Sequence, residues 1–370
     1  IAAGLVDDAV TLLESGADRG DLDPRDILEC TGAFGPGVTD KRPGILLREA
    51  RALHELGWWD RRHDAVQQLA EVINTGEHGD VLPALQAERA LDLVMLESRA
   101  SDARELAETA LVADPLDLVT QLRALEALGR SLAFDPDPAS VARARTVLKR
   151  ALELSEEIGP PRWRVRLTMA YAKAILFPSG RAGELLATYD QILALTTPGT
   201  RQRADLQIYR CEALADLGRD DELNAAASEA ATIAERLGDT RLRALAAWVK
   251  ALSSSQRGDV ERTLELLTEV ELLMPGGLDR KIGIFFYADA AEQCLKLDRP
   301  LIARRYLRRL ERFEDIDGEG ALYVLQARAF VEAFHGDPID AIAMLDQLQR
   351  EHPMGRDDWR RHLHRATAYE

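Results

Sequence analysis

Apolar side chains recur along the chain at intervals of three and four residues, which places them on one face of a helix. Two clear examples are Ala103, Leu106, Ala107, Ala110 and Leu111, and Leu185, Leu186, Tyr189, Ile192 and Leu193. Glycine, proline or aspartate follows most such stretches, as expected where one helix stops and the next is capped. The pattern predicts an all-α chain built from short helices joined by turns.

Between residues 200 and 350 one helix–turn–helix pattern is repeated. The central residues of the turns are Gly218, Gly258, Asp298 and Gly336, which lie 40, 40 and 38 positions apart. A fixed period in this range is typical of helical-repeat solenoids, in which similar hairpins stack side by side.

A small residue lies seven positions before each turn. These residues are Cys211, Ala251, Ala291 and Ala329, and Ala50 stands in the same relation to the earlier turn at Gly57. Seven positions is two helical turns, where a small side chain lets the partner helix approach closely. The repeat therefore predicts a close helix contact at each of these positions.

The expected fold is one right-handed superhelical solenoid of about eight to nine antiparallel helix pairs, covering residues 1–370. Residues 1–43 are expected to form an irregular N-terminal repeat and junction, with a short helix at 24–33. Less regular repeats occupy 44–197, where a helix is expected to begin at Pro115. Regular repeats occupy 198–351, and 352–370 is expected to be the first helix of a truncated repeat, so that the natural protein continues past Glu370.

Composition and charge narrow the function. Apolar residues make up 46% of the chain, charged residues 30%, and the formal net charge is −16. Phosphate binding needs clustered Lys and Arg, so direct contact with nucleic acid is not expected. No apolar run is long enough to span a membrane. Cys30, Cys211 and Cys294 fit no disulfide or metal framework, and a reducing cytoplasmic location is expected.

The sequence lacks the common catalytic motifs. It contains no G-x-x-x-x-G-K-[ST], H-E-x-x-H or C-x-x-C pattern. His362 and His364 are two positions apart and would point to different faces of a helix. We expect no enzymatic activity, no cofactor and no metal site.

The candidate binding surface is the concave groove that the first helices of stacked pairs line. Side chains ten, six and three positions before each turn should face it: Leu47, Arg51 and His54; Ile208, Glu212 and Ala215; Trp248, Leu252 and Ser255; Ala288, Glu292 and Leu295; Gln326, Phe330 and Ala333. Several apolar members can equally pack against neighbouring helices. The candidate binding residues are Arg51, His54, Glu212, Trp248, Glu292 and Gln326. Trp58 and Trp59 either pack at their turn or line the same groove.

The phrase Phe334-His335-Gly336-Asp337-Pro338-Ile339-Asp340-Ala341 resembles the tetratricopeptide repeat, in which a Gly-Asp turn precedes a helix with alanine at its first inward position. The period, nearer 40 than 34, resembles the superhelix of MalT-like regulators, which are ATP-dependent transcription activators of the LuxR type. The run Lys41-Arg42-Pro43-Gly44-Ile45-Leu46-Leu47 is similar to the way that repeat region begins.

These resemblances imply two functions. In the first, the chain is the signal-sensing or partner-binding region of a larger bacterial transcription regulator, and a protein, peptide or small-molecule effector shifts its conformational equilibrium. In the second, it is a free-standing tetratricopeptide scaffold that mediates protein–protein assembly.

Overall fold

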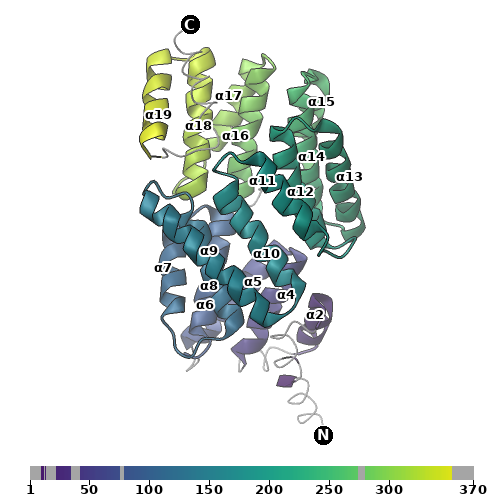
Figure 1. Ribbon diagram of the computed structural model, residues 1–370, viewed down its shortest axis with the longest axis vertical. Coiled ribbons are helices and arrows are strands. Elements are labelled where there is room, and N and C mark those ends of the chain that lie inside the picture. The colour runs from purple at the N-terminus through teal and green to yellow at the C-terminus, as the bar shows by residue number, and fades with distance from the viewer. Residues whose placement is uncertain are drawn as a thin grey trace.

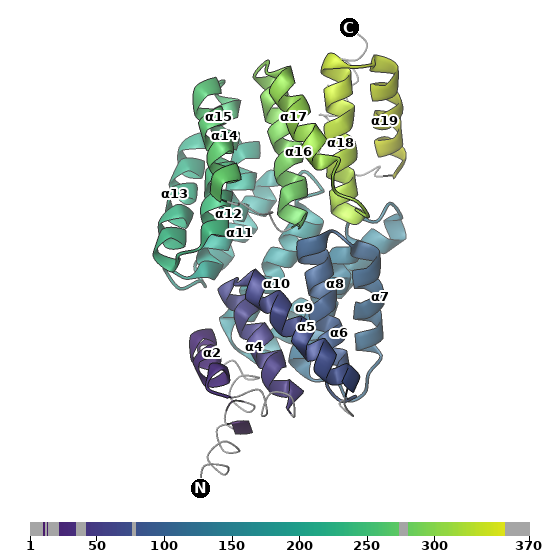
Figure 2. The same ribbon diagram turned by 180° about the vertical axis from the view of Figure 1, so that it is seen from behind.

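A computed structural model describes residues 10–11, 13, 22–34, 42–75, 79–273 and 280–351. Within these residues the chain is helical and contains no strand (Figures 1 and 2). The expected all-α helical-repeat solenoid is confirmed. The expected terminal helix at 352–370 and most of the N-terminal 1–21 lie outside the described residues.

The described part of the chain contains eight consecutive helix pairs, preceded by α2 (Pro24–Gly32). The pairs are α4 (Pro43–Leu56) with α5 (Trp59–Thr75), α6 (Leu82–Asp92) with α7 (Ala100–Leu111), α8 (Leu118–Leu132) with α9 (Pro138–Ile158), α10 (Pro161–Tyr171) with α11 (Ala182–Leu193), α12 (Arg201–Asp216) with α13 (Asp220–Leu237), α14 (Thr240–Gln256) with α15 (Val260–Leu273), α16 (Arg280–Lys296) with α17 (Pro300–Leu310), and α18 (Gly318–His335) with α19 (Pro338–Glu351). Two π-helical segments, η1 (Leu93–Glu97) and η2 (Ala172–Leu176), extend α6 and α10.

The stack of pairs curves back on itself and forms two tiers. Helices α2 to α10 make the lower tier in Figure 1, and α11 to α19 make the upper tier. Figure 2 shows the same two tiers from behind. First helices of successive pairs contact each other at several places in the stack: α6 contacts α8, α8 contacts α10, and α12, α14, α16 and α18 contact one another in order. The curvature therefore places these first helices toward the inside of the superhelix.

The small residue seven positions before each turn is fully buried in every repeat where the sequence predicts it. Ala50, Cys211, Ala251, Ala291 and Ala329 all have 0% of their surface exposed. The Cys211 thiol faces the partner helix and donates to the Leu223 carbonyl oxygen at 3.5 Å. Burial raises the pKa of this thiol to about 12, so the side chain behaves as a small hydrophobic group. The predicted close helix contact is confirmed.

Three of the four regular turns share one backbone conformation. Gly218, Gly258 and Asp298 have φ values of 65°, 74° and 56°, in the left-handed region that favours glycine. Gly336 differs, with φ −128° and ψ −138°, although it occupies the matching place in the sequence. There the Glu332 carboxylate accepts a hydrogen bond from the Asp337 N–H at 3.0 Å and stabilises a different exit from the helix.

The expectation that a helix begins at Pro115 is wrong. Helix α8 begins at Leu118, because the Asp117 carboxylate accepts a hydrogen bond from the Thr120 N–H at 2.9 Å and so caps the helix. An aspartate cap two residues downstream outweighs the preference of proline for the first helical position.

The buried hydrophobic side chains form a series of clusters along the stack. The first helix α14 contributes one face to each of two successive clusters. Leu242, Ala246 and Val249 belong to the cluster shared with α12 and α13, while Ala244, Ala247 and Ala251 belong to the cluster shared with α15 and α16. Because each first helix is apolar on both sides, every pair is stabilised by its neighbours.

The two tiers are joined by a contact that we call the closure contact, between residues 94–101 and residues 281 and 317–320. The Asp317 carboxylate accepts hydrogen bonds from the backbone N–H groups of Ala100 and Ser101, the latter at 2.8 Å. The Asp317 N–H in turn donates to the Ser98 carbonyl oxygen at 3.1 Å. A residue of the upper tier therefore caps the N-terminus of α7 in the lower tier, and a carboxylate there also complements the helix dipole.

Replacing Asp317 with alanine should remove this cap and weaken the closure contact. We expect a loss of about 1 kcal/mol in the free energy of unfolding and a larger radius of gyration by small-angle X-ray scattering. Asp137→Ala is the matched control, because Asp137 caps α9 locally, through the Ala139 N–H at 3.0 Å. An unchanged radius for both variants would show that the closure contact does not hold the tiers together.

Candidate ligand-binding cavity

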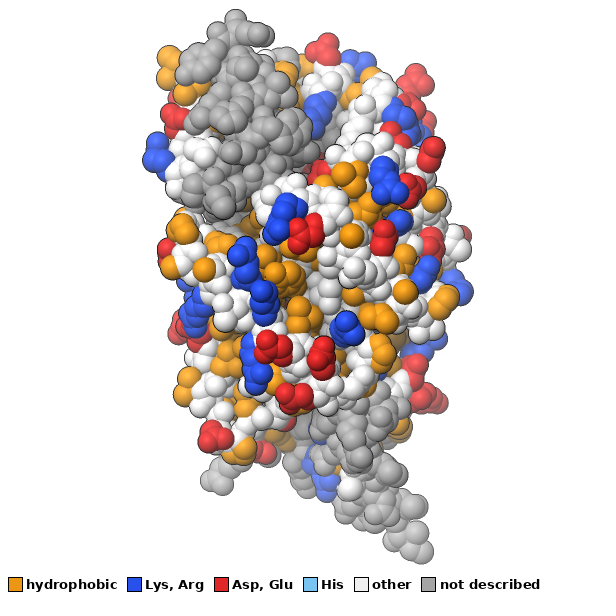
Figure 3. All heavy atoms as spheres, viewed as in Figure 1, with side chains coloured by type: hydrophobic (Ala, Val, Ile, Leu, Met, Phe, Trp, Pro, Cys, Tyr) orange, Lys and Arg blue, Asp and Glu red, His pale blue; other side chains and the backbone are white. Residues whose placement is uncertain are grey.

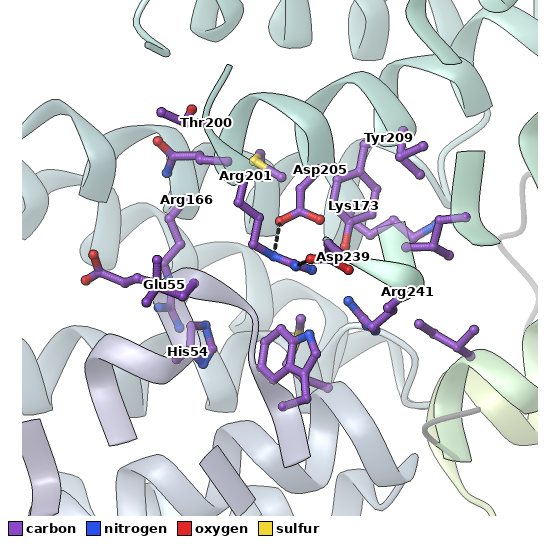
Figure 4. A pocket seen from close by; sticks show the side chains of 18 of the residues that line it. His54, Glu55, Arg166, Lys173, Thr200, Arg201, Asp205, Tyr209, Asp239 and Arg241 are labelled. Atoms are coloured by element: carbon purple, nitrogen blue, oxygen red, sulfur yellow. Dashed lines mark ion pairs between the residues drawn. The ribbon is translucent and has the colours of Figure 1, made fainter. Parts of the chain in front are cut away.

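A cavity of about 1000 Å³ lies between the tiers. It is lined from below by α4, α8, α10 and η2, and from above by α12, α14, α16 and α18 (Figure 4). This volume is at the upper end of the range for pockets that hold small ligands, about 300–1,000 Å³. The cavity is thus the inner hollow of the superhelix, which lies where the solenoid turns back on itself and remains partly open to solvent.

Aromatic side chains are concentrated on the cavity wall. The protein has five tryptophans, of which Trp58, Trp59, Trp163 and Trp248 line the cavity and Trp359 lies outside the described residues. The other aromatic lining residues are Phe177, Tyr209, Phe285 and Tyr323. Tryptophan combines a large apolar surface with one N–H donor, and for that reason it is frequent where ligands and partners bind.

The structure divides the six candidate binding residues into two groups of three. His54, Glu212 and Trp248 line the cavity, as do Ile208 and Leu252 from the wider list. Arg51, Glu292 and Gln326 do not line it and are buried within the helical wall, with 8%, 8% and 5% of their surface exposed. Glu292 pairs with Lys296 at 2.6 Å on the same helix.

Arg51 belongs to a buried ionic cluster in the lower tier. Glu88 lies at its centre and pairs with Arg51, Arg62 and Arg123 at 3.1, 3.0 and 2.9 Å. Burial alone would raise the pKa of Glu88, but the three guanidinium groups outweigh it and hold the pKa at about 2. The cluster ties α4, α5, α6 and α8 together, and Arg51 also donates to the Thr120 hydroxyl at 2.8 Å.

Glu88→Gln should strongly destabilise the lower tier, because it leaves three buried arginines without their shared carboxylate. The expected loss in the free energy of unfolding is about 3–5 kcal/mol, measured by chemical denaturation. Glu153→Gln, at an exposed position on α9, is the control with the same change of charge. Equal stability of the two variants would contradict a structural role for the cluster.

His54 lies in the wall of the cavity at the end of α4. Its ring meets the Trp59 ring edge to face, with centroids 4.9 Å apart. Burial and the nearby Arg166, Arg62, Arg123 and Arg130 hold the pKa of His54 well below its usual value, so the imidazole is neutral. Its Nδ1 atom has no hydrogen-bond partner among the described residues.

This lowered pKa predicts a loss of stability in mild acid. Below pH 6.5 the unfolded chain binds a proton at His54 that the folded chain does not, so stability falls by up to about 1.4 kcal/mol per pH unit. Thermal unfolding of His54→Gln between pH 7.5 and 5.5 should lack that part of the decrease. The exposed His63 provides the control, since His63→Gln should follow the wild-type pH dependence. Identical profiles for wild type and His54→Gln would contradict the assignment.

Ion pairs lie on the cavity wall, and one of them joins the two tiers. Lys173 of η2 pairs with Glu212 of α12 at 2.7 Å. Arg201 pairs with Asp205 at 3.3 Å and with Asp239, as the dashed lines in Figure 4 show. The Arg241 guanidinium carbon lies 5.1 Å from the centre of the Trp59 ring, which brings α14 against the start of α5. Charges of both signs thus face the hollow.

Sequence reasoning missed the part of the wall that α10 and η2 contribute. Arg162, Trp163, Arg166 and Lys173 all line the cavity. The predicted groove positions depend only on the turns at Gly57 and in the regular repeats, and leave out the turn at Gly180, which joins η2 to α11 and has a φ of 70°. That glycine, and the pattern of Trp and Arg at spacings of three and four in residues 162–173, were the available signals.

Among the described residues, no three His, Cys, Asp or Glu side chains are grouped so that they could hold a metal ion. In the same part of the chain, every helix is too short or too polar to cross a membrane.

No model of a known protein family matches this sequence, and no curated protein is similar to it at a significant level. Several solved structures have a fold similar to that of this chain. A Rap protein in complex with competence and sporulation factor has a TM-score of 0.59 and 14% identity, over 89% of this chain and 96% of that one. A tetratricopeptide repeat protein from Parabacteroides merdae has a TM-score of 0.46 and 12% identity, over 78% and 99%. The similarity to the Rap protein concerns the fold, which is an all-α helical-repeat solenoid.

Proposed function

We propose that this chain is a non-catalytic binding module that takes a short peptide into the cavity between its two tiers. The observation that carries the proposal is the hollow of about 1000 Å³ with four tryptophans on its wall. Aromatic surfaces bind apolar side chains, and ion-paired groups of both signs suit the mixed polarity of a peptide better than that of a polyanion.

The comparison with solved structures supports this proposal. The Rap protein whose fold is similar along nearly its whole length was solved in complex with a factor. For the present chain, a ligand would contact helices of both tiers at once, because residues from α4 to α18 line one continuous hollow. A ligand bound in this way stabilises the closed arrangement of the tiers relative to an open one.

We further propose that this module senses a signal for a larger transcription regulator of the MalT-like kind. The support is the period near 40 and the sequence around Lys41 to Leu53. A protein or peptide is the expected effector, and a small molecule is the alternative. The coding sequence next to this segment tests whether the module belongs to such a regulator. An ATP-binding loop upstream and a helix-turn-helix downstream are expected, and their absence would contradict this proposal.

A free-standing scaffold is the second candidate, and the outer surface favours it. Leu301 and Ile339 are 80% and 76% exposed and occupy equivalent positions, each directly after the proline that begins an outer helix. Acidic and basic side chains are interspersed on the face seen in Figure 3. If partners bind this convex surface, Leu301→Ser and Ile339→Ser should abolish their recovery in pull-downs, whereas cavity variants should not.

Filling the cavity tests the main proposal. Leu252 is half-buried on the cavity wall, and Leu252→Trp would place a larger ring in the hollow. A random hexapeptide library is incubated with the protein, and retained peptides are identified by size exclusion and mass spectrometry. We expect wild type to retain a defined subset, and Leu252→Trp to retain at least tenfold less.

Leu301→Trp is the matched control, because it adds the same ring on the outer surface of α17. It should retain peptides as wild type does. Equal retention by wild type and Leu252→Trp would place binding outside the cavity. Retention of metabolites but not of peptides would overturn the peptide class and leave a small-molecule effector.

A further inference from the structure

The charge on the cavity wall is divided between the tiers. Lining residues in the range 23–177 include five Lys or Arg and three Asp or Glu, whereas those in 195–323 include four Lys or Arg and six Asp or Glu. His54 is neutral and does not alter this division. In a chain of net charge −16, the lower wall is therefore locally cationic and the upper wall anionic.

The cationic wall is centred on Trp163, at the start of α10. The guanidinium carbons of Arg123 and Arg166 each lie 5.5 Å from the centre of its ring. Arg166 donates from Nε to Glu126 at 2.6 Å, but its Nη2 has no hydrogen-bond partner among the described residues. Arg162 pairs with Glu55 at 3.5 Å, and its Nε is likewise without an acceptor. Figure 4 shows Arg166 beside Glu55 and His54.

A small side pocket of about 20 Å³ lies behind this wall and shares Arg162, Trp163 and Glu55 with the cavity. Arg123 lines the side pocket and is fully buried. One of its nitrogens donates to Glu88 at 2.9 Å, while Nε and Nη2 have no acceptor among the described residues. Burial, together with the neighbouring Arg166, Arg51 and Arg62, outweighs the attraction of Glu88 and lowers the pKa of Arg123 to about 9.

These three arginines together leave buried N–H donors unsatisfied, and buried donors without acceptors are costly. A carboxylate supplies two oxygens in the planar geometry that a guanidinium group matches, and its charge offsets the local excess of cations. A neutral carbonyl would satisfy a donor but leave the charge unbalanced. The three arginines therefore favour a ligand with a carboxylate group, whose two oxygens share a negative charge.

The upper tier offers the opposite charge at Asp289 of α16. Its carboxylate accepts hydrogen bonds from Trp248 Nε1 at 2.6 Å and from the Gln293 amide. The nearby Lys296 forms its ion pair with Glu292, at 2.6 Å, instead of with Asp289. Burial and the nearby Glu292 raise the pKa of Asp289, so a cation brought to this carboxylate would relieve an unfavourable charge.

We propose that the peptide binds with its free C-terminal carboxylate at Arg162 and Arg166 beside Trp163, and with its cationic end toward Asp289. This inference rests on the proposed function and specifies the class of peptide. A free peptide carries one charge of each sign at its ends whatever its side chains, which matches a hollow whose two walls differ in sign.

The test compares three hexapeptide libraries that lack Asp and Glu, so that the C-terminus is the only carboxylate. One has free ends, one a C-terminal amide and one an acetylated N-terminus. Retained peptides are counted by size exclusion and mass spectrometry on the full chain. We expect the amide library to be retained at least tenfold less than the free library, because a charge-assisted hydrogen bond is lost. The acetylated library should also be retained less.

Arg162→Gln and Arg166→Lys locate the carboxylate. Arg162→Gln removes the 3.5 Å ion pair with Glu55. Arg166→Lys keeps the positive charge but loses the planar guanidinium group, which can bind both oxygens of a carboxylate. Both should abolish the preference for free over amidated peptides, while Arg150→Gln, an exposed arginine on α9, should keep it. The helical circular dichroism of each variant is recorded to confirm folding.

The outcomes separate this inference from the proposed function. Equal retention of free and amidated peptides by wild type overturns the carboxylate site, while binding in the cavity still stands. A preference that survives in folded Arg162→Gln and Arg166→Lys also overturns it. Retention of no library overturns the proposed function itself, and the inference with it.

Discussion

Close approach of helices at one small residue per repeat is the constraint on which the rest of the structure depends. Ala50, Cys211, Ala251, Ala291 and Ala329 are fully buried at the same distance before their turns. A larger side chain there would push the two helices of a pair apart. Because these five pairs are packed in the same way, the small rotation between neighbouring pairs adds up, and the stack curves.

The curvature alone does not enclose a cavity; contacts between the tiers do. Asp317 caps α7 across 217 positions of sequence, and Lys281 pairs with Glu319 at 3.1 Å while donating to the Val94 carbonyl oxygen at 2.9 Å. At the other side, Arg241 lies over Trp59. The hollow between these contacts is lined by helices that are far apart in the sequence, which is why charged groups of opposite excess face each other across it.

The sequence allowed the repeat, the helix pairs and the buried small residues to be predicted, because these depend on side chains within about 40 positions. It did not allow the closure contact to be predicted. Asp317 lies directly before α18, where an aspartate is expected to cap the helix that follows it. Nothing nearby in the sequence marks it as the cap of α7. Arg51 was proposed for the groove because a polar group in a helix seam is unusual, yet Glu88, 37 positions away, accounts for it.

The closure contact also has a consequence for folding. Most contacts in a solenoid join residues close in sequence and form early, whereas the link between Asp317 and α7 spans more than half the chain. The hollow therefore comes into existence only at the last step of assembly. Partly folded chains with complete hairpins would lack it, so recognition would be limited to molecules that have finished folding.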